Sequence, residues 1–294
     1  MSLYWLGIAV ALLAGASNNF GIVVEKKALN RLPEGQKVGR HLLKNRLWLL
    51  GFILNIVITS ILVFYAEYLI GPTLVPGLEA TGMIILAIGS LRLLKETIKT
   101  PEIIGISFMI LAILCLSFSE LAIDINTSAL AETGFLIRVV IFTLILVVGS
   151  IVTRIVRAKR ENLKGIAYAI DSGLMFGLNN FWIAPLIGLI DNIFAGSLAT
   201  NELILLILAF VTLPIVNYFG IFYMQKSLEF GQASNMRPIQ QAPVQIVPVF
   251  YFFAIFLLAP PQIFSLPLAI SGIALILVSM LLLSRRAGQL EAIK

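Results

Sequence analysis

Two pairs of adjacent asparagines interrupt apolar runs that are otherwise suited to crossing a membrane. The first pair lies in "ASNNFG" (residues 16–21) and the second in "LNNFW" (residues 178–182). Lipid cannot satisfy the donors and acceptors of an amide, so each side chain must bond either to a neighbouring helix or to a solute. Adjacent helical positions point about 100° apart, so one asparagine of each pair is expected to face a shared cavity. The candidate substrate-binding residues of this kind are Asn18, Asn19, Asn179 and Asn180.

Ionisable residues inside apolar runs form a second set of candidates, because charge is costly in a membrane and usually has a function there. Glu79 lies well inside the third apolar run, between Gly77 and Gly82, and Asp171 lies near the start of the sixth. A carboxylate in such a place could bind a cationic solute and a proton in turn, which would couple their opposite movements. For Asp171, as for the asparagines, a structural contact between helices is the alternative. These residues identify no metal site and no catalytic group.

The composition is that of a membrane protein with many spans. Of 294 residues, 59% are hydrophobic and 12% are charged, and the mean hydropathy is +1.00. Soluble domains contain about 25% charged residues. The net charge of +6 comes from basic residues in short loops, so it indicates membrane topology and not binding to nucleic acid. One cysteine (Cys115) and one histidine (His41) exclude a disulfide framework and a CxxC metal site.

Nine apolar runs have a length of about 20 residues, which crosses the hydrocarbon core as a helix. The predicted fold class is therefore an all-α membrane protein with nine transmembrane helices. We interpret the first run as a retained helix and not as a signal peptide, because "MSLYW" before it has no basic side chain. The runs are Leu3–Val24, Leu47–Ile70, Thr73–Leu94, Pro101–Phe118, Gly134–Val156, Gly165–Ile190, Leu203–Met224, Ile239–Leu258 and Phe264–Ser284.

Lysine and arginine are segregated to alternate loops. Segments 119–133 and 191–202 contain acidic residues but no lysine or arginine. The positive-inside rule therefore predicts an external N-terminus and a cytoplasmic C-terminus, in the plasma membrane. The basic residues gather in four segments, at 25–46, 95–100, 154–164 and 285–294.

Polar positions recur at a spacing that indicates an internal duplication. Matching helices of the two copies are five spans apart. Because five is an odd number, the matching helices would cross the membrane in opposite directions. The predicted organisation is two inverted four-helix repeats, residues 1–118 and 165–294, joined by a linker helix and loops at 119–164. This repeat adds Asn55, Asn217 and Gln241 to the candidates. A shift of 161 or 162 residues places Asn18-Asn19 on Asn179-Asn180, Asn55 on Asn217, Pro76 on Pro238 and Glu79 on Gln241.

The chain resembles the drug/metabolite transporter superfamily. Each four-helix unit is similar to a small multidrug resistance subunit, with "FYAEYLI" ending the second helix and "LRLLKE" ending the third. "EKKAL", "GPTLVPGL" and "YMQKSLEFGQASNMRP" are similar in position and type to segments of the NIPA-like magnesium transporters. This resemblance implies a nine-helix transporter of a small solute or a divalent cation, without a cofactor, working in the lipid bilayer as a monomer or homodimer.

These features favour a secondary transporter that moves a small solute by alternating access. An intramembrane enzyme is a distant alternative, because the sequence has no HExxH, GxSxG or GxGD motif. A channel or a scaffold is also a distant alternative, because the sequence shows no ring of acids and no carbonyl filter that a channel would need. The substrate stays open between two classes. One is magnesium or another divalent cation, which needs hard oxygen ligands such as carboxylates and amides, and the other is an organic solute on which aromatic side chains could stack.

Overall fold

The computed structural model describes residues 2–31, 42–70, 75–121 and 132–291, and within these ranges every regular element is a helix. This confirms an all-helical membrane protein with several spans. His41 lies outside the described residues. Seven described segments are long and apolar enough to cross a membrane: Leu3–Leu29, Arg46–Ile70, Val75–Arg92, Thr100–Phe118, Thr133–Lys159, Thr200–Phe230 and Ser265–Gln289.

The predicted spans at 165–190 and 239–258 correspond to α9 (Lys164–Gly188) and α12 (Ala233–Ala254). Both are long helices, but neither is among the seven candidate spans of the described residues. The first half of α12 carries Asn235, Arg237 and two glutamines, which lowers its apolar character. The count of nine transmembrane helices therefore stays a prediction.

The N-terminal half of the chain packs around its first helix. That helix, α1, contacts η2 and α3 along one side and α4 and α5 along another, while α6 contacts α4. The elements of this half are α1 (Ser2–Leu29), η1 (Leu42–Lys44), α2 (Arg46–Phe52), η2 (Ile53–Ile58), α3 (Thr59–Ile70), α4 (Val75–Ala80), α5 (Met83–Arg92) and α6 (Thr100–Phe118).

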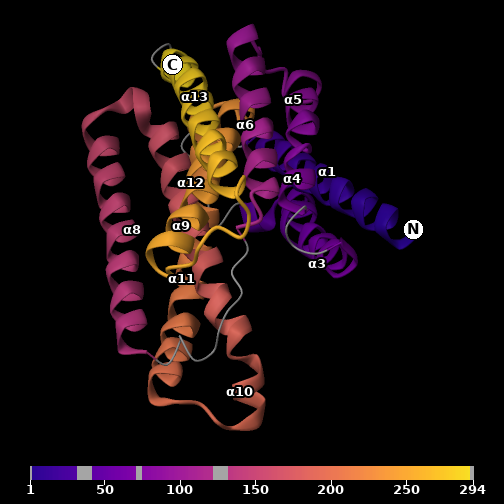
Figure 1. Cartoon of the computed structure of the whole chain (residues 1–294). Helices are drawn as coiled ribbons and strands as arrows, with labels where there is room; N and C mark the ends of the chain where they lie inside the picture. Colours follow the sequence, from indigo (N-terminus) through magenta and orange to yellow (C-terminus); the bar gives the residue numbers. More distant parts are fainter. Residues whose placement is uncertain (1, 32–41, 71–74, 122–131, 292–294) are drawn as a thin grey trace.

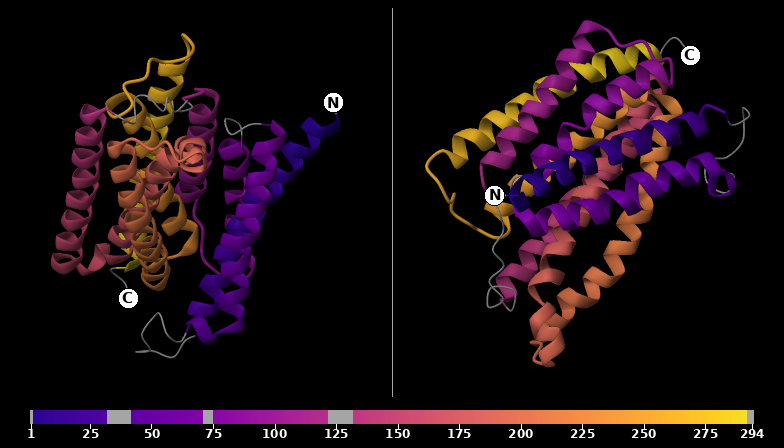
Figure 2. Two further views of the ribbon diagram at one scale, coloured as in Figure 1. Left: turned by 90° about the horizontal axis from the view of Figure 1, so that it is seen from below. Right: turned by 90° about the vertical axis from the view of Figure 1, so that its right-hand side faces the viewer.

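The C-terminal half is built around α9. This helix packs against α11 and α12, and α8 covers it from the outer edge of the molecule, opposite to α1 and α3 (Figures 1 and 2). The two halves meet where α6 runs along α13. The remaining elements are α8 (Thr133–Lys159), η3 (Glu161–Leu163), α10 (Ile190–Ala195), α11 (Thr200–Phe230) and α13 (Ser265–Glu291).

Helix α1 continues five residues beyond the predicted end of the first span. Its last turn contains Lys26 and Lys27, which the sequence analysis placed in a basic loop. Lys26 is buried and its Nζ donates to the carbonyl of Leu228 at the end of α11. Basic side chains suit the C-terminal turn of a helix, where carbonyl groups lack partners. The positive charge at this end of α1 thus serves a helix contact, beside the role in membrane topology that the sequence predicts.

Irregular backbone occurs next to the predicted polar positions. Asn55 lies in η2, a π-helical turn, where the Ser17 and Thr59 hydroxyls each donate to the Leu54 carbonyl at 2.9 Å. Such turns are rare and are found mostly at functional sites. The third span is interrupted at 81–82, between α4 and α5, directly after Glu79-Ala80. Pro76 lies in the first turn of α4, between one and two turns before this break.

Helices α1 and α2 approach each other through glycine. A Cβ atom at Gly51 would lie 2.7 Å from the carbonyl oxygen of Gly21 and 2.8 Å from the backbone nitrogen of Glu25. Real side chains do not tolerate such distances to backbone atoms, so the two helices can touch only where both residues lack a side chain. This contact sets the positions of Glu25 and Asn55.

We therefore expect Gly51→Ala to destabilise the protein by about 1–3 kcal/mol, because the added methyl group must push the two helices apart. The measurement is the melting temperature of the purified protein in detergent. The matched control is Gly149→Ala on α8, where a Cβ would meet only the Leu174 Cδ1 atom at an ordinary 3.4 Å. Equal melting temperatures for the two variants would contradict the close packing of α1 on α2.

Candidate functional site

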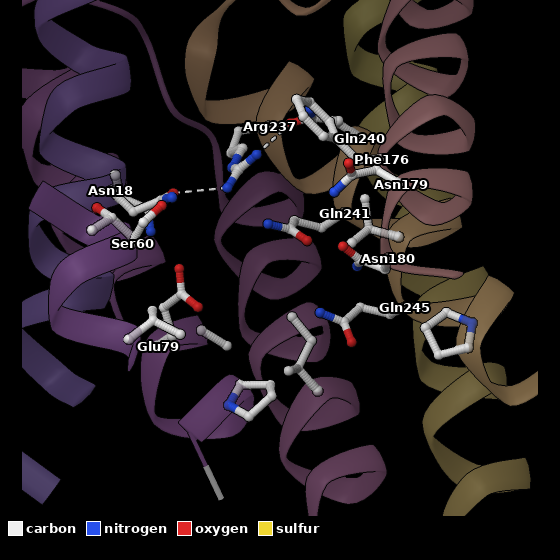
Figure 3. Close-up of a pocket in the computed structure, with 18 of the residues that line it drawn as sticks. Asn18, Ser60, Glu79, Phe176, Asn179, Asn180, Arg237, Gln240, Gln241 and Gln245 are labelled. Carbon is white, nitrogen blue, oxygen red and sulfur yellow. Dashed lines mark hydrogen bonds between the residues drawn. The ribbon is translucent and has the colours of Figure 1, made fainter. Parts of the chain in front are cut away.

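A cavity of about 840 Å³ lies between the two halves of the chain. Figure 3 shows its polar walls, with Asn18 and Glu79 on one side and Asn179, Asn180 and Gln241 on the other. Helices α1, α3 and α4 of the first half face α9, α11 and α12 of the second across this space. Of the site residues predicted from the sequence, those that line the cavity are Asn18, Asn19, Asn55, Glu79, Asn179, Asn180, Asn217 and Gln241.

Asp171 is the one predicted site residue that does not line this cavity. Its buried carboxylate lies 2.5 Å from Arg157 Nη1 on α8 and also accepts a hydrogen bond from Thr153. The guanidinium of Arg157 in turn lies 4.2 Å from the ring centre of Tyr168. The structure thus places Asp171 in an ion pair that fastens α8 to α9, which is the structural alternative considered for it above.

Arg237 joins the two walls of the cavity. Its Nη2 donates to Asn18 Oδ1 on α1 at 2.7 Å, and its Nη1 donates to Gln240 Oε1 at 2.5 Å (Figure 3). Gln240 then donates to the Ser172 hydroxyl on α9 at 2.7 Å. This chain of hydrogen bonds links α1 to α12 and α9 with neutral acceptors alone. The sequence analysis did not propose Arg237 as a site residue.

Glu25 is an acidic residue of the cavity that the sequence analysis also missed. It accepts a hydrogen bond from Asn55 Nδ2 at 3.1 Å and another from the side-chain amide of Gln225 on α11. Gln225 Oε1 is held in turn by the indole nitrogen of Trp48 at 3.0 Å. The apolar run ends at Val24, which places Glu25 in the basic segment 25–46. A signal was present, because Glu25 follows Asn18 by seven residues and so lies on the same face of a continued helix.

Asn179 and Asn19, one asparagine from each pair, have different environments. Asn179 Oδ1 accepts from Asn217 Nδ2 at 2.5 Å, which joins α9 to α11. Asn19 donates to the Gly15 carbonyl at 3.0 Å, but its Oδ1 is buried without a hydrogen-bond partner among the described residues. Gln241 Oε1 is in the same condition. An unsatisfied buried acceptor costs about 1–3 kcal/mol, so these oxygens are suited to receive a solute or its water shell.

The charges that line the cavity are mostly negative. Glu25, Glu67, Glu79 and Glu120 contribute carboxylates, and Arg237 is the one basic residue among the described lining residues. No hydrogen bond or ion pair in the described part of the chain engages the Glu79 carboxylate. Glu79 is therefore an acceptor that is free for a ligand, in a cavity whose field attracts cations.

No group of three or more histidine, cysteine or acidic side chains close enough to hold a bare metal ion occurs within the described ranges. The carboxylates are instead spread along the wall, with amides between them. This arrangement fits a cation that keeps part of its hydration shell, because water then fills the coordination positions that the protein does not supply.

The cavity reaches one end of the helix bundle and is closed at the other. Its lining extends to Glu67 and to the turn 119–121 after α6. At the opposite end, Glu96 accepts from the backbone nitrogens of Ala233 and Ser234 at 2.8 and 3.2 Å. Asn235 donates to Glu102 at 2.7 Å beside them. These bonds tie the region between α5 and α6 to the first turn of α12.

Comparison with known proteins gives a distant similarity to a transporter. The chain is 28% identical over 184 residues to a protein of Arabidopsis thaliana described as "Probable magnesium transporter NIPA9". The alignment covers 59% of this chain and 53% of that protein, so the chain spans about half the length of this curated relative. No family profile matches the chain. No solved structure matches it.

Proposed function

We propose that this protein is a membrane transporter that moves a hydrated cation, with magnesium as the first candidate, through the cavity between its two halves. The observation that carries this proposal is the set of four carboxylates and seven predicted amide residues on the wall of one cavity, where Glu79 has no hydrogen bond or ion pair among the described residues. The distant similarity to a magnesium transporter supports the choice of cation. In this proposal Glu79 holds the ion, and the unpaired amide oxygens bond to the ion's water shell.

A hydrated divalent ion suits the dimensions of the site. Magnesium gives up its water reluctantly and is usually held by one or two carboxylates. The cavity volume of about 840 Å³ is far larger than a bare ion needs, and it leaves room for the water shell. The amides then act as second-sphere partners that bond to the ion's water molecules.

An organic cation is the second candidate. A volume of about 840 Å³ lies within the range of roughly 300–1,000 Å³ that is typical of small-molecule pockets. Phe176 and Tyr251 also line the cavity and offer aromatic faces for a cation. Glu79 would bind the charge in either case.

Alternating access is the transport mode that we propose. Its basis is the predicted pair of inverted repeats, residues 1–118 and 165–294, with 119–164 between them. In support, α1 packs on the second span of its half as α9 packs on α11. The cavity extends to the predicted outer end, so the conformation described corresponds to an outward-facing state, closed on the cytoplasmic side by Glu96 and Glu102.

Binding to the purified protein is the first test. Ligands that bind only the folded state raise its melting temperature by mass action. We expect Mg²⁺ to stabilise the detergent-purified protein at concentrations where Na⁺ does not, and proteoliposomes to take up Mg²⁺ with saturation. Stabilisation by a panel of organic cations without any response to Mg²⁺ would select the second candidate. No response to either class would refute the proposal.

The proposed orientation in the plasma membrane has its own test. In a Cys115→Ala background, a cysteine at exposed Ser197 is expected to react with an impermeant thiol reagent in intact cells. A cysteine at exposed Arg160 should react only after permeabilisation. Labelling at 160 in intact cells would reverse the orientation and, with it, the side to which the cavity leads.

A further inference from the structure

A permanently charged guanidinium in the cavity of a cation transporter needs a physical reason. Arg237 lines the same cavity as Glu25 and Glu79, and it is the one basic side chain among the described lining residues. An arginine cannot be deprotonated in a protein, so its charge is always present. Its charge must repel any cation that enters, and the site would bind a cation more tightly without it.

The contacts of Arg237 hold this charge in the cavity without neutralising it. The guanidinium donates to Asn18 Oδ1 at 2.7 Å and to Gln240 Oε1 at 2.5 Å, which are both neutral acceptors. None of the ion pairs found in the described residues involves Arg237. Its Nε is buried without a hydrogen-bond partner in the part of the chain that the structure describes. The protein thus fixes the guanidinium near the carboxylates but does not let it form a salt bridge with them.

We infer that Arg237 is an internal cation that competes electrostatically with the transported ion for Glu79 and Glu25, and that it thereby sets the affinity of the site and its preference between ion valences. This inference rests on the proposed function. A carrier must release what it binds, so weakening the site serves transport. Four cavity carboxylates without a balancing charge would hold a divalent ion too long for turnover.

Valence supplies a quantitative signature of this role. Coulomb energy is proportional to the charge of the ion, so removal of Arg237 should change log Kd for a divalent ion by about twice the change for a monovalent ion. A side chain that only held the helices in place would change both affinities alike, through loss of folded protein. If Arg237 bound an anionic part of the cargo, its removal would weaken binding, so the change in log Kd would have the opposite sign.

The experiment measures Kd for Mg²⁺ and for K⁺ by thermal shift with the full-length wild type, Arg237→Gln and Arg237→Lys. We expect Arg237→Gln to bind Mg²⁺ at least about tenfold more tightly, with half of that logarithmic change for K⁺, and to transport more slowly. Arg237→Lys keeps the charge and should bind Mg²⁺ with an affinity close to that of the wild type. Equal or weaker Mg²⁺ binding by a folded Arg237→Gln would overturn the inference. Absence of Mg²⁺ binding by the wild type would instead overturn the proposed function.

A second variant tests the same idea with added charge and does not depend on the folding of Arg237→Gln. Gln245 lines the cavity one turn beyond Gln241 (Figure 3). Gln245→Lys is expected to weaken Mg²⁺ binding about tenfold, with the smaller change for K⁺, while Gln245→Met of similar length leaves the valence preference unchanged. Equal effects of the lysine and methionine variants on both ions would refute an electrostatic role for charge in this cavity.

Discussion

Glu79→Gln is expected to lower Mg²⁺ uptake at least about tenfold while the protein still folds. Glutamine has the same shape as glutamate but no charge, so the cavity keeps its form and loses a carboxylate that has no hydrogen bond or ion pair within the described ranges. A hydrogen bond to a charged group contributes about 1.5–3 kcal/mol, which corresponds to a factor of ten or more in affinity. The measurement is initial uptake rate in proteoliposomes together with the Mg²⁺ concentration at half-maximal rate.

Tolerance of an amide at this position has support in the chain itself. In the predicted repeat Gln241 occupies the position equivalent to Glu79, and both residues line the same cavity. The matched control is Glu161→Gln, which removes an exposed carboxylate that pairs with Lys164 outside the cavity. An unchanged uptake rate in folded Glu79→Gln would remove Glu79 from the transport mechanism and leave it as a helix contact.

Asp171→Asn is expected to act on stability and not on ion binding. The substitution leaves the Arg157 guanidinium, only 10% exposed, without its carboxylate partner at 2.5 Å. Loss of one member of a buried ion pair typically costs about 3–5 kcal/mol. The melting temperature of the purified protein should therefore fall steeply, while the Mg²⁺ affinity of the fraction that remains folded stays near that of the wild type.

A double variant separates the two roles of this pair. Replacing both partners, as Arg157→Met with Asp171→Leu, removes the charge on both helices and should recover most of the lost stability, because buried ion pairs are often no better than apolar contacts. Loss of Mg²⁺ binding in a stable double variant would return Asp171 to the substrate site, where the sequence analysis placed it.

Much of the architecture follows from the sequence, because lipid imposes simple rules. Apolar runs of sufficient length must be helices when water is absent, so the seven candidate spans of the described residues coincide with predicted runs. Helix boundaries do not follow in the same way, since α1 includes Glu25, Lys26 and Lys27 where composition indicates a loop. Helix ends depend on partners in other segments, such as the Leu228 carbonyl, which a local pattern does not reveal.

The candidate residues divide in the same way. Polar residues in apolar runs must have a reason to be there, so composition alone selected Glu79, Asp171 and the asparagines. Composition does not distinguish a cavity from an ion pair. Asp171 and Glu79 have the same chemistry, but Arg157 on α8 neutralises one while the other faces the space between the two halves.

The sequence by itself determined that this chain is a helical membrane protein, where its apolar segments lie, and which amides and acids within them need partners. Tertiary structure decided which of those groups meet. Glu25, Arg237 and Gln225 come from helices far apart in the chain, and they gather because α1, α11 and α12 pack together around one cavity. The physical reason is that burial and charge pairing depend on distances across the bundle, whereas helix formation in lipid depends on each segment's own backbone and side chains.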